Sequence, residues 1–162
     1  MSAQTPLPSA KHVRELVEGL IGRDVRVTTG GAMLDPNGGD GTLVGIYVDD
    51  RRALTSIVLL DLSLAAYLGA ALGLVPVRVA GDAVVEGVLP AALSENAGEV
   101  LNVMASLFNA EGAPHVRLDT IYEPRHPLPA DVAAWVLAYV RRTDLDMEIA
   151  GYGAGQFSLL VL

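Results

Sequence analysis

Apolar residues near the start of the chain first follow the spacing of a helix and then that of a strand. Spacings of three and four positions join Val13, Leu16, Val17 and Leu20. Ser9 is typical of a helix N-cap and Gly22 of a helix stop, so we predict a helix over 10–21. The alternating segment 24–29 predicts a strand.

Two strands and a short helix are predicted in the next part of the chain. Segments 42–50 and 52–62 are rich in aliphatic residues and are separated by a polar turn. The second segment is almost entirely apolar, which indicates a strand in the centre of a sheet. The apolar segment 63–74 predicts a helix, with Ser63 as its N-cap.

The second half of the chain predicts further helices and strands. We expect a helix over 82–109 that is kinked or broken at Pro90, because a proline ring removes a backbone hydrogen bond. A strand over 115–124 and a helix over 129–141 follow. Two closing strands then flank the glycine-rich segment 151–155.

The order of these elements predicts the fold class. Strands and helices do not alternate strictly, so we predict an α+β fold with a mixed, largely antiparallel sheet packed against long helices. At 162 residues the chain has the length of one domain with a sizeable core. We expect a flexible N-terminal tail over 1–9 and a single domain over 10–162.

Composition and charge exclude several classes of function. Hydrophobic residues make up 51% of the chain, but no window of about 20 residues is apolar enough for a membrane span. We therefore expect no membrane insertion. The absence of cysteine excludes disulfides and thiolate zinc sites and fits a cytoplasmic protein. A net charge of −8 disfavours nucleic acid and favours basic partner surfaces.

The sequence does not predict a metal site. Asp35, Asn37 and Asp40 lie between glycines and resemble part of a calcium loop, but the distal bidentate glutamate of such loops is missing. Aspartate, asparagine and glycine are also ordinary turn residues, so we favour a hairpin loop. The histidines are far apart, without the spacing of metal ligands.

A line of polar residues on the predicted helix over 82–109 is the main candidate for function. On a helix that advances about 100° per residue, Glu95, Glu99 and Asn102 lie within roughly 60° of one another. We call these three residues the polar stripe, and Ser106 continues their line. Apolar residues occupy the opposite side, and small residues such as Gly98 flank the polar stripe. We therefore expect it to face solvent.

Two interpretations of the polar stripe follow from the residues alone. Any exposed helix face carries glutamate and asparagine, which makes a solvated face the ordinary reading. Alternatively, an amide that orients a water molecule and an anion that holds a basic group suit docking to another protein. Asparagine is a very weak base, so Asn102 would position a water rather than deprotonate it.

The segment LSENAGEVLNVMASLF, residues 93–108, resembles the signature helix of the CheC/CheX/FliY phosphatases of bacterial chemotaxis. That signature is an acidic residue or serine, three residues, glutamate, two residues and asparagine, which Glu95, Glu99 and Asn102 match. The other candidate helix, 63–74, has neither glutamate nor asparagine. The chain therefore resembles the CheX type, which has a single signature helix.

The resemblance implies an activity and a partner. It implies a CheX-like phosphatase that hydrolyses the aspartyl phosphate of a CheY-type response regulator. Asn102 would orient the attacking water and Glu99 would pair with a basic residue of the regulator, while Glu95, Gly98 and Ser106 would contact the partner. The regulator would supply magnesium, so no cofactor is expected in this chain. The resemblance also implies a homodimer. The very apolar segments 56–62 and 157–162 fit a sheet edge or a helix face that a second copy covers, since exposed apolar edges invite pairing.

Two features depart from the family pattern. Leu101 stands where the family usually has glycine, and its side chain is either harmless packing or an obstacle to the regulator. A helix over 129–141 is not expected in the family. A non-catalytic CheX-like module that binds a regulator or dimerises therefore remains an alternative, as does an α+β protein unrelated to signalling. The last alternative would be favoured if the polar stripe were buried or covered by the helix over 129–141.

Overall fold

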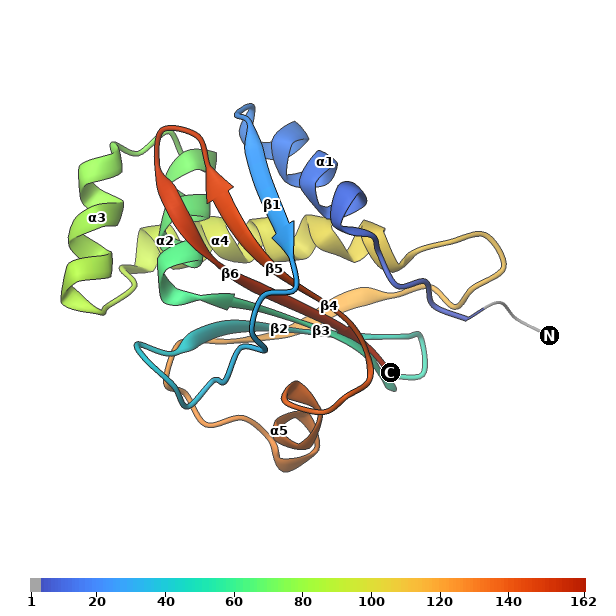
Figure 1. Ribbon diagram of the computed structural model, residues 1–162. Helices are drawn as coiled ribbons and strands as arrows, with labels where there is room; N and C mark the ends of the chain where they lie inside the picture. The colour runs from blue at the N-terminus through green and yellow to red at the C-terminus, as the bar shows by residue number, and fades with distance from the viewer. Residues whose placement is uncertain (1–3) are drawn as a thin grey trace.

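A six-stranded sheet organises the computed structural model, which describes residues 4–162 (Figure 1). The strands are β1 (Val25–Thr29), β2 (Thr42–Val48), β3 (Leu54–Asp61), β4 (Arg117–Tyr122), β5 (Arg141–Ile149) and β6 (Gly153–Val161). Their order in the sheet is β1-β5-β6-β3-β2-β4, and every neighbouring pair is antiparallel. The predicted α+β class is confirmed.

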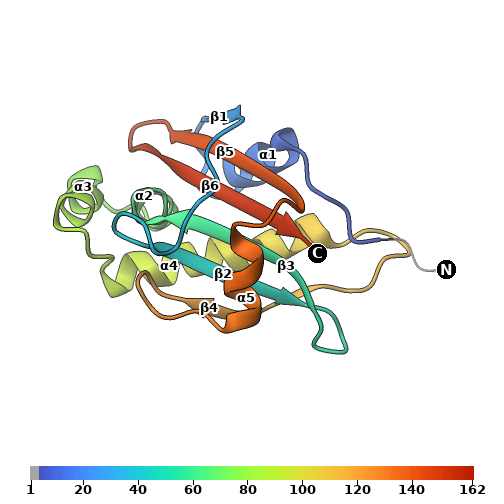
Figure 2. The same cartoon turned by 60° about the horizontal axis from the view of Figure 1, so that its bottom comes forward.

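Helices cover the two faces of this sheet unequally. They are α1 (Ala10–Ile21), α2 (Leu62–Leu72), α3 (Val77–Glu86), α4 (Ala91–Val103) and α5 (Ala130–Val136), with a 3₁₀ helix η1 (Met104–Phe108) directly after α4. Helices α1, α2 and α4 pack on one face, and α5 packs with the loop over 30–41 on the other (Figures 1 and 2). Successive residues of β3 alternate between the two cores, as expected for a strand buried on both faces.

The two most apolar strands, β3 and β6, are neighbours in the middle of the sheet. Leu59 and Leu160 lie in one core, and Leu60 and Leu159 in the other. The edges of the sheet are β1 and β4. Of the two expected arrangements, a sheet edge formed by these apolar strands is therefore wrong, because each strand is buried within its own chain. The homodimer itself stays a prediction.

The close contact of α2 with α4 depends on a glycine. A Cβ atom on Gly69 would lie 2.3 Å from the carbonyl oxygen of Leu93. Next to this contact, the side-chain amide of Asn96 donates to the carbonyl of Gly69 over 3.0 Å. The absence of a side chain at Gly69 thus allows the two helices to approach until their backbones are almost in contact.

A buried tyrosine fixes α4 to the sheet. The Tyr47 hydroxyl, which comes from β2, donates to the carbonyl of Leu101 in the last turn of α4. Helix carbonyls in this position commonly lack a partner within the helix. The Tyr47 ring also lies 5.0 Å from the ring of Phe108 in η1. Burial raises the pKa of Tyr47, so the phenol stays protonated and remains a donor.

Helix α2 begins one residue earlier than predicted, and its N-cap is Asp61 rather than Ser63. Asp61 ends β3 in an extended conformation, and its carboxylate accepts from the backbone N–H of Leu64 over 2.8 Å. The sequence does not indicate this role, because Asp61 lies within the predicted strand over 52–62. Burial raises the pKa of this carboxyl group, opposed by hydrogen bonds from backbone N–H groups.

The segment predicted as one helix over 82–109 is three elements. Helix α3 starts at Val77, directly after Pro76, and ends at Glu86, before Gly87 in a left-handed conformation. Pro90 is then the N-cap of α4, so the predicted break at this proline is confirmed. The predicted helix over 82–109 thus misses the start of α3, whose buried residues are Ala80 and Ala83.

Helix α5 is much shorter than the predicted helix over 129–141. Val132 and Val136 are buried, but Tyr139 is 94% exposed and lies beyond the helix end. The guanidinium of Arg142, on strand β5, donates to the carbonyls of Val136 and Ala138 over 3.1 and 2.8 Å. These bonds satisfy carbonyl groups at the end of α5, where a positive charge is favourable.

The segment before α1 is attached to strand β5. Arg141 donates to the carbonyl of Thr5 over 3.0 Å, and Thr143 donates to the carbonyl of Pro8 over 3.1 Å. Thr5 and Pro8 are both buried. Residues 5–8 therefore differ from the flexible tail that we expected over 1–9, whose first three residues lie outside the described part. Between residues 4 and 162, no helix has the length and apolar composition needed to cross a bilayer.

We predict that Gly69→Ala lowers the free energy of unfolding by about 1–3 kcal/mol, because the new methyl group forces α2 away from α4. The measurement is urea unfolding followed by circular dichroism. Gly81→Ala in α3 is the matched control: a Cβ there meets no atom within 4 Å, so helix propensity should make this change neutral or stabilising. Equal destabilisation by both changes would contradict the packing argument.

A second prediction concerns pH. Asp61→Asn keeps an oxygen atom that accepts from the Leu64 N–H, and it removes a carboxyl group whose pKa is raised by burial. Because the pKa of this carboxyl group is higher in the folded state than in the unfolded state, the folded state binds the proton first as the pH falls from 7. The free energy of unfolding of the wild type should therefore rise relative to that of Asp61→Asn as the pH falls through the folded-state pKa. Urea unfolding at several pH values tests the sign. Asp61→Ala, which loses the cap, should cost about 1 kcal/mol at pH 7.

Candidate docking site on helix α4

Helix α4 lies between α2 on one side and β4 on the other (Figure 1). On the α2 side, Asn96 donates to the backbone of Gly69. On the β4 side, the Ser94 hydroxyl donates to the carboxylate of Glu123, and Ile121 contacts Gly98. The buried side of the helix packs on the sheet. Only one ridge of α4 therefore remains open to solvent.

The polar stripe occupies this open ridge. Glu95, Glu99 and Asn102 are all exposed, as their spacing predicts. Within residues 4–162 their side chains form no hydrogen bond or ion pair. Helix α5, which we considered as a possible cover, packs on the opposite face of the sheet. The carboxylates and the carboxamide are therefore available to another molecule.

Ser106 does not lie on the same α-helix as the polar stripe. The helix changes from α to 3₁₀ geometry after Val103, and Ser106 is in the middle of η1. A 3₁₀ helix turns about 120° per residue rather than about 100°, so Ser106 departs from the line that α-helical spacing predicts. It is nevertheless exposed, and it lies one turn beyond Asn102.

Gly98 differs most from our expectation. We expected it to flank the polar stripe at the surface, but it is buried beneath β4. A Cβ atom at Gly98 would lie 3.1 Å from the side chain of Ile121. Gly98 thus lets β4 pack against the helix, and it offers no surface of its own to a partner.

Leu101 is fully buried, and it does not obstruct the polar stripe. Its side chain lies over Gly45 of β2, where a Cβ atom would be 3.3 Å from it. Its carbonyl accepts the hydrogen bond from Tyr47. Of the two readings left open by the sequence, the structure supports packing, because Leu101 points into the core while Asn102, about 100° further around the helix, is exposed.

The surface around the polar stripe is acidic. From Ala91 to Ala113 the chain has no lysine, arginine or histidine. Glu123, directly after the neighbouring strand β4, is also an exposed acid. Such a surface attracts a basic partner and repels nucleic acid. Chemically, the ridge can offer an anion at Glu99 and an amide that both donates and accepts at Asn102.

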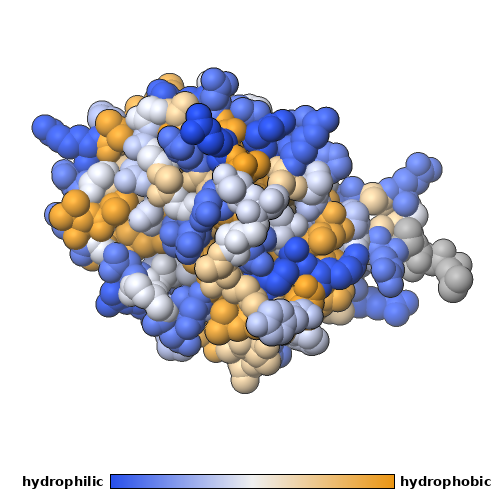
Figure 3. Space-filling model, viewed as in Figure 1, coloured by the Kyte–Doolittle hydropathy of each residue, from blue (hydrophilic) through white to orange (hydrophobic). Residues whose placement is uncertain are grey.

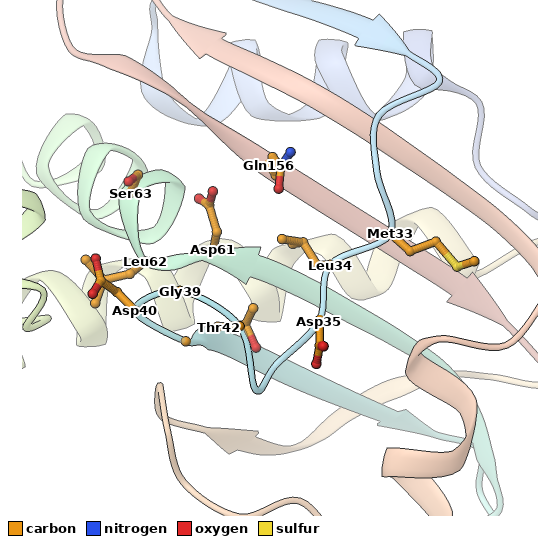
Figure 4. Close-up of a pocket in the computed structure, with 12 residues that line it drawn as sticks. Met33, Leu34, Asp35, Gly39, Asp40, Thr42, Asp61, Leu62, Ser63 and Gln156 are labelled. Carbon is orange, nitrogen blue, oxygen red and sulfur yellow. The ribbon is translucent and has the colours of Figure 1, made fainter.

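A hollow of about 320 Å³ lies on the other side of the molecule, beside the loop over 30–41 (Figure 4). Asp61, Ser63 and Gln156 line it, together with Asp40. Asp40 pairs with Arg125 over 3.4 Å. In the described residues, no three acidic, histidine or cysteine side chains are grouped as metal ligands.

The loop beside this hollow is built from ordinary turns. The carboxylate of Asp35 accepts from the backbone N–H of Asn37 over 2.9 Å, and the carbonyl of Asp35 accepts from Gly38. These bonds support ordinary turn chemistry, but the expected hairpin loop is wrong, because β1 and β2 are not neighbours in the sheet. Because the hollow is on the face away from α4, it is separate from the polar stripe.

Exposed apolar side chains gather on α3 and its flanking turns (Figure 3). Leu74, Val85 and Val88 are 80%, 88% and 60% exposed. The sequence does not indicate this patch, because the predicted helices over 63–74 and 82–109 leave the start of α3 unassigned. Exposed apolar patches are typical of contact surfaces, and the residues of this patch carry no groups for chemistry.

Comparison with known proteins identifies the fold. No family model and no curated protein matches the sequence. The structure is similar to Thermotoga maritima FliY, with a TM-score of 0.54, 15% identity, and coverage of 92% of this chain and 82% of that one. The FliM middle domain of Vibrio alginolyticus has a TM-score of 0.57 at 11% identity, with 93% and 86% of the two chains covered.

A third similar structure is FliM in a FliM–SpeE complex from H. pylori. Its TM-score is 0.54 at 10% identity, and the alignment covers 94% of this chain and 80% of that one. All three alignments extend over nearly the whole chain, so the similarity includes the sheet and its helices. At these identities the comparison shows the fold and not the activity. The chain has the fold of FliY and of the FliM middle domain.

Proposed function

We propose that this protein is a CheX-like phosphatase that hydrolyses the aspartyl phosphate of a CheY-type response regulator, in chemotaxis or another two-component pathway. The observation that carries the proposal is the exposure of Glu99 and Asn102, one turn apart, on the open ridge of α4. Neither side chain has a partner within residues 4–162. Their spacing matches the signature of the CheC/CheX/FliY phosphatases, and the fold is that of FliY.

In this proposal the ridge of α4 enters the active site of the regulator. The carboxamide of Asn102 holds a water molecule in line with the phosphorus, and the water attacks as the bond from phosphorus to the aspartyl oxygen breaks. The aspartate leaves as a carboxylate, and inorganic phosphate is released. Acyl phosphates are already reactive, so a positioned nucleophile supplies most of what the reaction needs.

The other residues of the ridge serve docking. Glu99 pairs with a basic residue of the regulator, and Glu95 strengthens attraction on the same acidic surface. Magnesium comes with the regulator, and this chain needs no cofactor of its own. The burial of Leu101 supports the proposal. Leu101 is the residue that departs from the family pattern, and its buried side chain does not project toward a partner.

The alternative is a non-catalytic module that binds a regulator or dimerises. It is favoured by the similarity to FliM, since two of the similar FliM structures are complexes with other proteins, SpeE and FliG. The exposed apolar patch on α3 also suits protein contacts. The two functions differ in their effect on the phosphorylated regulator, because only a phosphatase shortens its lifetime.

A dephosphorylation assay distinguishes them. CheY-type receiver domains are phosphorylated with acetyl phosphate in the presence of magnesium, and phosphate release is followed with and without this protein. We expect the wild type to accelerate release. Asn102→Ala should lower the acceleration about 100-fold, because the water is no longer positioned. Glu99→Ala should lower it about tenfold through weaker pairing with the regulator.

The matched control is Asn37→Ala, which removes an exposed asparagine on the other face of the molecule. It should leave the rate of phosphate release unchanged. If the wild type shortens the lifetime of no receiver in a panel but still binds one, the non-catalytic alternative replaces the phosphatase. If Asn37→Ala and Asn102→Ala behave alike, the assignment of Asn102 is wrong.

A further inference from the structure

A groove of about 580 Å³ opens at the end of the ridge that carries the polar stripe. One wall is the segment over 6–8, and another is the first turns of α1. The third wall is η1, which contributes Ser106 and Leu107. Apolar side chains from all three walls line the groove, namely Leu7, Leu16 and Leu107. Sequence reasoning did not find the groove, because it placed residues 1–9 in a flexible tail.

Hydrogen bonds hold two of the three walls of the groove in place, namely the segment over 6–8 and η1. Arg141 and Thr143 hold the segment over 6–8 by bonds to the carbonyls on either side of Leu7. At the end of η1, Asn109 donates to the carbonyls of Ala105 and Val116, and accepts from the N–H of Val116. The groove is therefore formed before any partner arrives, which lowers the entropic cost of binding.

The groove lies within reach of a protein that docks at Asn102. Ser106 follows Asn102 by one turn, an advance of about 6 Å along a helix. A standard protein interface covers about 800 Å² on each partner, which corresponds to a disc of about 16 Å radius. A receiver domain centred on Asn102 therefore extends over Ser106 and the mouth of the groove.

We propose that this groove receives an apolar side chain from the surface of the same receiver domain, and that it sets affinity while Asn102 performs the chemistry. The inference rests on the proposed phosphatase function. Leu7 is 37% exposed at the groove, so it has apolar surface that a partner can cover. A preformed apolar pocket beside a charged contact is the usual arrangement of an anchor residue in protein interfaces.

The rim of the groove does not select the partner by charge. Glu15 lies at the rim but is paired with Lys11 over 3.8 Å, and His12 is close by. The attraction of a basic receiver surface comes from Glu95 and Glu99 on the ridge instead. The groove thus adds an apolar contact to an electrostatic one, and the two contributions can be separated by mutation.

The test is Leu7→Glu, which places a charge in the groove and keeps both backbone bonds that hold the segment. We expect the KM for the phosphorylated receiver to rise at least roughly tenfold with kcat unchanged. Leu137→Glu is the matched control, since Leu137 is 45% exposed but lies at the end of α5 on the other face. It should leave KM unchanged. Thermal melts followed by circular dichroism confirm that both variants fold.

Calorimetric binding of a beryllofluoride-activated receiver separates this inference from the proposed function. Leu7→Glu should weaken binding at least roughly tenfold, and Asn102→Ala should change it much less. If the wild type is active but Leu7→Glu has a normal KM and Kd, the groove proposal is wrong and the phosphatase stands. If the wild type neither hydrolyses nor binds, both fail. Conversion of a dimer to a monomer by Leu7→Glu, seen by light scattering, would assign the groove to a second copy instead.

Discussion

The position and rotation of α4 on the sheet are the constraint on which the proposed site depends. Two buried contacts set it: the Tyr47 hydroxyl bound to the carbonyl of Leu101, and the backbone approach of α2 at Gly69. The first fixes the rotation of the last turn of α4, and the second fixes its distance from α2. A rotation by one residue position, about 100°, would turn Asn102 out of line with its ridge. Core packing therefore determines which side chains a partner can reach.

The polar stripe could be predicted from sequence because it depends on local geometry. Glu95, Glu99 and Asn102 share one face at α-helical spacing, and their polarity keeps them at the surface. Helix α1 was predicted for similar reasons, from its apolar face and its caps at Ser9 and Gly22. The hairpin of β2 and β3 was marked by two apolar runs around a polar turn.

Features that depend on distant residues could not be predicted in the same way. The end of α5 is set by Arg142 on the next strand, and the position of residues 5–8 is set by bonds to β5. Gly98 lies at the edge of the exposed face in a helical projection, but β4 covers it. In each case tertiary contacts override the local pattern. The groove beside η1 follows from these contacts, so no pattern in the sequence indicates it.

The fold alone does not determine what this protein does. FliY and FliM middle domains share it at 10–15% identity, and function is determined by the side chains placed on it. The most direct test of the account is an NMR titration of the isotope-labelled protein with a beryllofluoride-activated receiver domain. We predict shifts of amide signals along α4 and into η1, with little change in α5 or the loop over 30–41. Shifts confined to α5 and that loop would contradict it, since the partner would then dock on the opposite face.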